Sequence, residues 1–177
     1  MTHTVDGATT DLVDRLVGLA PGSATQALRH RRDKVAVATQ QSYDALFDPA
    51  LEGLTLAERL LVACYASRLT PSATLFAHYR EALEQHGVDA ATRAAVETGT
   101  PDALAHLADA RLRAILAFTR TLIENPVAGD KAALATLPAA GLTTPAVVVL
   151  AQLIAFLSYQ TRVVAGLQAL QQLETPT

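Results

Sequence analysis

Apolar residues recur every three or four positions along most of the chain, and no stretch alternates in the manner of a β-strand. This spacing predicts an all-α protein of about seven or eight helices. Capping residues, prolines and glycines bound the segments that we expect to be helical. The expected helices cover residues 11–19, 23–47, 56–69, 70–86, 89–97, 100–124, 130–137 and 144–173.

Two helix starts carry a recognisable signal. Thr55-Leu-Ala-Glu58 is a capping box, in which the threonine oxygen accepts a backbone N–H and the glutamate reaches back to the cap. Thr70-Pro71 is interpreted in a similar way, as a capping hydroxyl followed by proline at the first helical position. Between them, Leu60–Ala66 is apolar on nearly every side, which predicts a buried central helix.

The remaining pattern indicates a single domain. No internal repeat, linker or low-complexity segment interrupts the chain, so residues 1–22 form an N-terminal segment with a short helix and residues 23–173 the helical domain. The helix expected over 23–47 carries one apolar stripe. Its members are Leu28, Val35, Ala38 and Leu46.

Composition narrows the class of protein. Half of the 177 residues are hydrophobic and 18% are charged, which is typical of a folded globular domain. A net charge of -3 gives a nucleic-acid backbone little to bind, so no nucleic-acid partner is expected. The basic cluster at 29–34 has two interpretations, a solvated helix face or a patch for an anion or a partner.

Cysteine use and hydropathy predict a cytoplasmic protein without a membrane partner. A single cysteine, Cys64, excludes an intramolecular disulfide and any cysteine-based zinc site, and it fits a reducing compartment. Met1–Thr10 is polar and lacks the apolar centre of a secretory signal. The most apolar run, Ala146–Leu157, is too short to span a bilayer and contains Gln152.

Three segments, taken in order, resemble a known family. They are LTLAERLLVACYASRL (54–69), DARLRAILAFTRTLIENP (109–126) and LPAAGLTTPAVVVLAQLIAFLSYQTRVVAGL (137–167). The chain resembles the carboxymuconolactone decarboxylase superfamily, specifically its AhpD-like, alkylhydroperoxidase-related branch, over about residues 23–170. The resemblance implies an AhpD-like helical domain, a peroxidase-type antioxidant oxidoreductase without a bound cofactor, and a homo-oligomer, as a dimer or a larger ring.

The chain departs from that branch at its redox motif, C-x-x-C-x-x-x-H. Counted back from His78, the two cysteine positions hold Pro71 and Thr74. Counted forward from Glu58-Arg59, they hold Ser72 and Leu75, and Tyr79 takes the place of the histidine. The two registers differ by one residue, which indicates a one-residue deletion at the turn.

Neither register supplies a thiol, and Leu60 stands where the family has the second glutamate of E-R-E. In the intact motif, a thiolate attacks the peroxide and a second cysteine resolves the sulfenic acid to a disulfide. Hydroxyl groups cannot cycle through these oxidation states. We therefore expect no intrinsic cysteine-based peroxidase activity.

Six residues near this turn are candidate site residues. The catalytic candidates are His78, Glu58 and Thr74, and the substrate-binding candidates are Arg68, Tyr79 and Ser72. Thr74 and His78 share a helix face because they are four residues apart. Four of the candidates also have a structural interpretation: a hydrogen-bonded or exposed histidine for His78, capping for Glu58, binding of helix-end carbonyls for Arg68, and a core or interface position for Tyr79.

Other reactive side chains are assigned structural roles. Cys64 is expected to be a packed small hydrophobe, with a reactive thiol as the alternative. Arg162 is either a paired interior charge or an interface anchor. His30, His86 and His106 are expected at the surface. No metal site is expected, because His78 and His86 lack further ligands at suitable spacing.

Three functions remain open at this point. The first is a peroxidase-related protein that would need Cys64 or a cysteine-bearing partner protein for redox chemistry. The second is a non-redox lyase or isomerase of the decarboxylase type, with His78 as acid or base and an arginine for the carboxylate of a small-molecule substrate. The third is a non-catalytic scaffold subunit that assembles through its apolar last helix.

Overall fold

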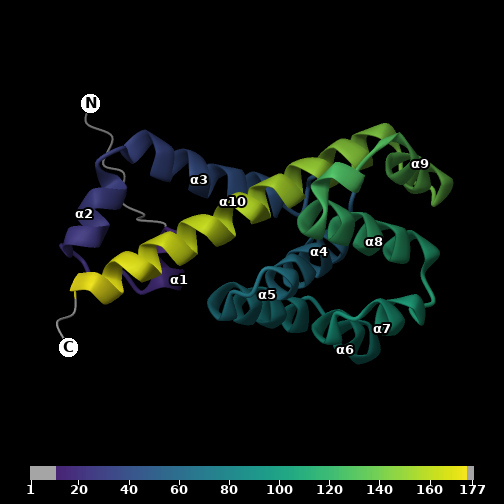
Figure 1. The fold of residues 1–177 in the computed structure, drawn as a ribbon, viewed down its shortest axis with the longest axis horizontal. Coiled ribbons are helices and arrows are strands. Elements are labelled where there is room, and N and C mark those ends of the chain that lie inside the picture. Colours follow the sequence, from purple (N-terminus) through teal and green to yellow (C-terminus); the bar gives the residue numbers. More distant parts are fainter. Residues whose placement is uncertain (1–10, 175–177) are drawn as a thin grey trace.

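The computed structural model describes residues 11–174, and within them it is all helical, with ten α-helices, one short 3-10 helix and no strand (Figure 1). The all-α prediction is therefore confirmed. The elements are α1 (Leu12–Val17), α2 (Ala24–His30), α3 (Asp33–Leu46), α4 (Leu56–Leu69), α5 (Ala73–Gln85), α6 (Ala90–Thr98), α7 (Pro101–Ala105), α8 (Ala110–Glu124), η1 (Pro126–Ala128), α9 (Lys131–Ala139) and α10 (Thr144–Glu174). Met1–Thr10, which was predicted to lack a secretory signal, lies outside the described residues.

Helix α4 is the central helix, as its sequence predicts. It has the predicted bounds, and both hydrogen bonds of the capping box are present, between Thr55 and Glu58. Every residue from Arg59 to Ser67 is buried, and the helix packs against α5, α6, α8 and α10. A helix that is apolar on every side is removed from water only when neighbouring helices cover every side.

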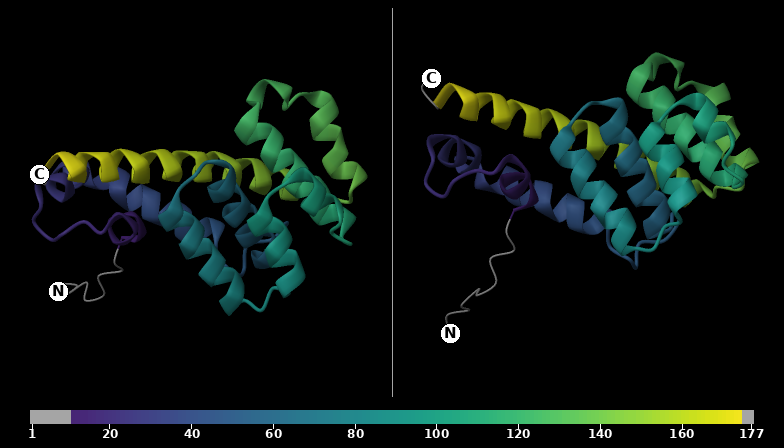
Figure 2. Two further views of the ribbon diagram at one scale, coloured as in Figure 1. Left: turned by 60° about the horizontal axis from the view of Figure 1, so that its bottom comes forward. Right: turned by 90° about the horizontal axis from the view of Figure 1, so that it is seen from below.

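The other elements form a helical body and an arm. Helices α4 to α9 make the body, while α1, α2, α3 and the C-terminal half of α10 extend away from it (Figure 1). Helix α10 belongs to both parts and packs against α4 and α8 as well as against α1, α2 and α3. Along the arm, no other helix lies on the outer side of α10 (Figure 2).

The long helix predicted over 23–47 is wrong, because two helices occupy this range. Helix α2 ends at His30, and α3 begins at Asp33 after a turn at Arg31 and Arg32. The break follows directly after Arg29 and His30, which pair with the carboxylates of Asp11, the N-cap of α1, and Asp14 within it. No local sequence pattern predicts these contacts. The predicted apolar stripe is broken too, since Leu28 is 51% exposed and Val35 46% exposed.

The predicted helix start at Thr70-Pro71 is also wrong. The Thr70 N–H donates to the Ala66 carbonyl, so this residue ends α4, and α5 begins at Ala73. A residue before proline is driven out of the helical region, which explains why Thr70 terminates a helix here. Ser72 occupies the N-cap position of α5 without a side-chain capping bond.

The helix predicted over 100–124 is likewise two helices. Thr100 caps α7 as its sequence indicates, but α7 ends after five residues. Asp109 then caps α8 by accepting bonds from the N–H groups of Arg111 and Leu112. The two divided segments account for the difference between the eight helices expected and the ten observed.

Helix α10 is longer than the apolar run singled out in the sequence. Among residues 11–174 it is the one helix long and apolar enough, by length and composition, to cross a membrane. Within its most apolar window of 18 residues, 39% are buried inside the structure. Core helices of soluble proteins meet the same criteria, and the absence of a membrane partner stays a prediction.

Candidate functional site

A groove of about 460 Å³ lies between α1 and α5, and it contains two of the six candidate residues, Thr74 and His78. Residues of α5 form one wall at helical spacing, and α1 supplies the other. The lining residues are Arg15, Leu16, Thr74, Ala77, His78, Glu81, Ala82 and Gln85. The groove is open to solvent along one side.

His78 is half-buried and held in place by aromatic neighbours. Its Nε2 lies 3.0 Å from the Tyr43 hydroxyl of α3, and its ring packs edge-on against the Tyr79 ring with centroids 4.9 Å apart. Burial lowers the pKa of the imidazole, and the positive charge of Arg15 lowers it further. The ring is therefore predominantly neutral at pH 7, which is the form that can accept a proton.

Thr74 connects the groove to the last helix. Its hydroxyl oxygen accepts a hydrogen bond of 3.0 Å from the Gln168 side chain of α10. Thr74 and His78 thus lie on one helix face, as their spacing predicts, and their positions are set by α10 and α3 respectively.

Tyr79 does not line the groove. Its side chain is fully buried, and its hydroxyl donates to Gln160 Oε1 on α10 at 2.7 Å. Burial raises the pKa of the phenol well above its ordinary value. Within the described residues, Gln160 Nε2 is the one buried side-chain polar atom without a hydrogen-bond partner. These contacts match the core interpretation of Tyr79.

Glu58, Arg68 and Ser72 lie outside the groove at His78. Besides its capping bond, Glu58 accepts a hydrogen bond of 2.7 Å from Arg111 and lies in a different surface hollow from His78. Arg68 is exposed and donates to the Glu97 carbonyl at 3.3 Å. Of the six candidates, the groove therefore contains only His78 and Thr74, while Tyr79 contacts His78 from the core side.

Cys64 is a packed core residue, as predicted. Its side chain is completely buried in α4, and burial raises the pKa of the thiol to about 12. The nucleophile toward a peroxide is the thiolate, which is scarcely populated at neutral pH when the pKa is this high. The geometry therefore opposes the alternative of a reactive thiol.

The sequence did not reveal two residues that act on His78: Arg15, which lines the groove with it, and Tyr43, which hydrogen-bonds its imidazole. Arg15 is a single basic residue in a short helix, and Tyr43 is one of four tyrosines in the chain. Neither stands in a motif with His78, since 63 residues separate Arg15 from it and 35 separate Tyr43. Packing of α1 and α3 against α5 brings them there, so a covariation signal between distant helices is the kind of information that would have identified them.

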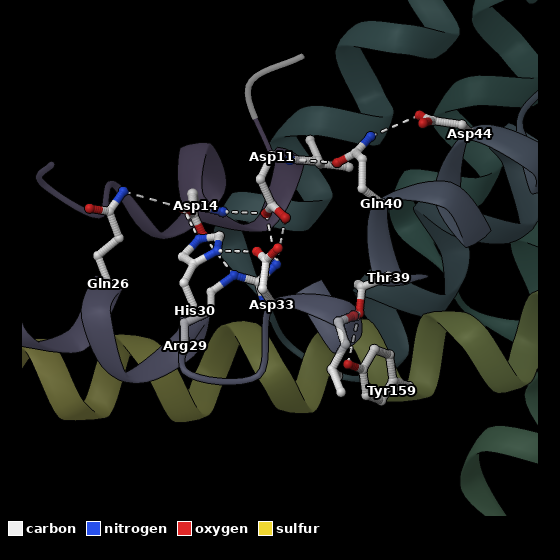
Figure 3. Close-up of polar contacts among 12 residues, drawn as sticks. Asp11, Asp14, Gln26, Arg29, His30, Asp33, Thr39, Gln40, Asp44 and Tyr159 are labelled. Atoms are coloured by element: carbon white, nitrogen blue, oxygen red, sulfur yellow. Dashed lines mark hydrogen bonds and ion pairs between the residues drawn. The ribbon is translucent and has the colours of Figure 1, made fainter. Parts of the chain in front are cut away.

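A second polar cluster joins α1 to α2 near the tip of the arm (Figure 3). Arg29 contacts both oxygens of Asp11 at 2.8 Å and Asp14 at 2.6 Å, while His30 Nε2 lies 2.8 Å from Asp14. The hydrogen bond to Asp14 raises the pKa of His30. Burial opposes ionisation of Asp14, but the bonds from His30 and Arg29 outweigh it and lower the pKa of this carboxyl.

This cluster changes two surface assignments. The Arg29 side chain is only 6% exposed, so it is not part of a solvated face, whereas Arg31, Arg32 and Lys34 are exposed as expected. His30 is ion-paired and two-thirds covered, unlike His86 and His106, which are exposed as predicted.

Arg162 is exposed on α10, which excludes the paired interior charge; the interface anchor stays a prediction. Its guanidinium donates to the Ser158 carbonyl one turn earlier. Within residues 11–174, no group of three His, Cys, Asp or Glu side chains is placed to hold a metal ion.

Comparison with known proteins does not assign the chain to a family. No protein-family model matches it, and no curated protein matches it significantly. The resemblance to the carboxymuconolactone decarboxylase superfamily therefore stays a prediction from the sequence.

Proposed function

We propose that this chain is an AhpD-like, peroxidase-related helical protein that has no thiol chemistry and acts on a small carboxylate in the groove at His78. The observation that supports this proposal is that the His78 imidazole and the Arg15 guanidinium line one groove, where burial lowers the pKa of the imidazole. Arg15 is exposed and makes no ion pair with the described residues, so its charge is available for a ligand carboxylate.

The groove supports proton transfer without a redox partner. Arg15 would bind the carboxylate, and the His78 imidazole would accept a proton from the bound acid and return it, as a general base and then a general acid. Tyr43 holds the imidazole by its hydrogen bond, and Thr74 adds a hydroxyl within the same groove. Lyase and isomerase reactions on small acids use this combination of groups.

Peroxide reduction by the chain's own cysteine is not expected. Hydroperoxide consumption with a dithiol reductant should equal the protein-free rate for the wild type and for Cys64→Ser alike, since the thiol is buried and protonated. The measurement is a coupled assay of peroxide loss across pH 6–9. Turnover in the wild type that disappears in Cys64→Ser would overturn this prediction.

Carboxylate binding should depend on two residues of the groove. We expect small mono- and dicarboxylates to shift the backbone amide signals of α5 around Thr74 and His78 in an NMR titration, a readout that every variant retains. Both Arg15→Gln and His78→Ala should weaken binding about 10-fold or more, the loss expected for a charge-assisted hydrogen bond. Arg68→Gln is the matched control, because Arg68 lies outside the groove and should leave binding unchanged.

A non-catalytic scaffold is the second candidate. The exposed apolar residues of α10 and α3 favour it, because monomeric proteins rarely leave such a surface open. A wild-type protein that binds no carboxylate in the same titration would support the scaffold and contradict the proposed acid–base function.

A further inference from the structure

One face of α10 is exposed along nearly its whole length. The exposed residues follow one another at alternating intervals of four and three, which places them on a single side of the helix. They are Val148, Gln152, Ala155, Tyr159, Arg162, Gly166, Ala169 and Leu173, and are called the outer stripe here. A 4-3 spacing of exposed positions is the geometry that a second helix can pack against.

The outer stripe lies in an apolar surface. Of the nine large hydrophobic residues exposed in the described part of the chain, seven belong to α2, α3 or α10. They are Leu28, Val35, Val37, Val148, Tyr159, Leu170 and Leu173. A groove of about 480 Å³ runs between α3 and α10, with Val35 and Ala38 on one side and Ala155 and Tyr159 on the other.

The ring of Tyr159 is fixed at the edge of this groove. Its hydroxyl lies 2.9 Å from the Thr39 hydroxyl, which itself donates to the Val35 carbonyl (Figure 3). The groove is therefore a formed surface with an anchored aromatic side chain, and its apolar walls remain in contact with water in a single chain.

Two residues make a lipid environment a poor match for this face. Arg162 and Gln152 lie within the outer stripe, where a bilayer would have to accommodate a cation and a carboxamide. A protein surface satisfies both groups more readily, because it can offer hydrogen-bond partners at fixed positions.

The outer stripe is complementary to itself in antiparallel orientation. When a second α10 is placed with the two-fold axis at the level of Leu157, Ala155 faces the partner's Tyr159 and Val148 faces the partner's Gly166. At these two levels a large side chain meets a small one, which lets the layers interdigitate. In the same register Arg162 faces the partner's Gln152, whose carboxamide oxygen can accept from the guanidinium.

The available area is adequate for a stable pair. From Val148 to Leu173 the stripe is about 38 Å long, and with α2 and α3 beside it the face is about 20 Å wide. Its outline of roughly 750 Å² is close to the roughly 800 Å² per partner of a standard interface.

We propose that the outer stripe of α10 and the adjoining α3 groove bind a second copy of this chain, with the two α10 helices antiparallel and crossing near Leu157. This inference goes beyond the function proposed for the His78 groove and depends on different residues. Failure of carboxylate binding would leave it intact, and a monomeric protein would not affect the groove at His78.

The first test is the oligomeric state of the full chain in solution. Light scattering after size exclusion should give twice the chain mass for the wild type, and the chain mass for Ala155→Arg, which places a second cation in the centre of the stripe. Ala91→Arg, at an exposed alanine of α6, is the matched control and should stay dimeric. Circular dichroism checks that Ala155→Arg keeps its helical content.

The second test measures orientation and register. The variants Ala155→Cys and Tyr159→Cys should form an interchain disulfide under mild oxidation when mixed, and far less when each is oxidised alone. Native Cys64 does not compete because it is fully buried. Three results would each overturn the proposal. The wild type could be monomeric at 100 µM, Ala155→Cys could cross-link with itself in preference to the mixture, or a monomer could sediment with anionic phospholipid vesicles.

Discussion

Replacing Arg59 with alanine is expected to lower the free energy of unfolding by about 4 kcal/mol, more than any other single change considered for this protein. Arg59 is fully buried at the start of α4, and no carboxylate of residues 11–174 pairs with it. Its guanidinium instead donates to the carbonyls of Leu46, Asp48 and Leu51, at 2.5 to 3.4 Å. One side chain thus holds the end of α3 and the loop that follows it.

The expected loss has two parts. Alanine removes a large buried side chain and leaves several backbone carbonyls without donors. Each unpaired carbonyl lowers the free energy of unfolding by about 1–3 kcal/mol if water cannot replace the guanidinium. Native domains are stable by only about 5–15 kcal/mol, so the variant should be close to unfolding at 37 °C. Urea denaturation followed by circular dichroism measures the difference directly.

Two further variants make this test specific. Arg68→Ala should cost less than about 0.5 kcal/mol, because Arg68 is exposed and donates to one carbonyl, that of Glu97. Arg59→Met keeps most of the volume and removes only the donors, so it separates packing from hydrogen bonding. A loss below about 1 kcal/mol for Arg59→Met would show that the carbonyls do not need the guanidinium.

Removing the Tyr79 hydroxyl should produce the second large effect. Tyr79→Phe is expected to cost about 2 kcal/mol, because it leaves the whole carboxamide of the buried Gln160 without a partner. The amide already has one unpaired buried group, Nε2, so no alternative donor compensates within the described residues.

A double-mutant cycle identifies this cause. Tyr79→Phe combined with Gln160→Leu should recover most of the lost stability, since an apolar pair of similar shape leaves nothing unpaired. Tyr159→Phe is the control, because its hydroxyl bonds Thr39 at a partly exposed site and should contribute less than about 1 kcal/mol. Additive losses in the cycle would contradict the explanation.

The sequence predicted the candidate site only in part. The spacing of Thr74 and His78 correctly placed both on one face of α5, because helical geometry is local. The resemblance to a redox family also predicted Glu58, Arg68 and Ser72 as site residues. Glu58 and Arg68 have other partners in the structure, and Ser72 is the N-cap of α5 outside the groove. Arg15 and Tyr43 reach His78 through packing between helices that are remote in the chain, which no local motif encodes.

The sequence by itself determined the helical class, the bounds of α4 and the burial of Cys64. These features follow from short-range physics: apolar periodicity, a capping box and an apolar surface that must be covered. Tertiary structure decided where α2 separates from α3, because ion pairs to Asp11 and Asp14 lie beside that break. It also decided that α10 keeps one apolar face open, since the pattern of α10 is apolar all round and only the arrangement of its neighbours leaves a side uncovered.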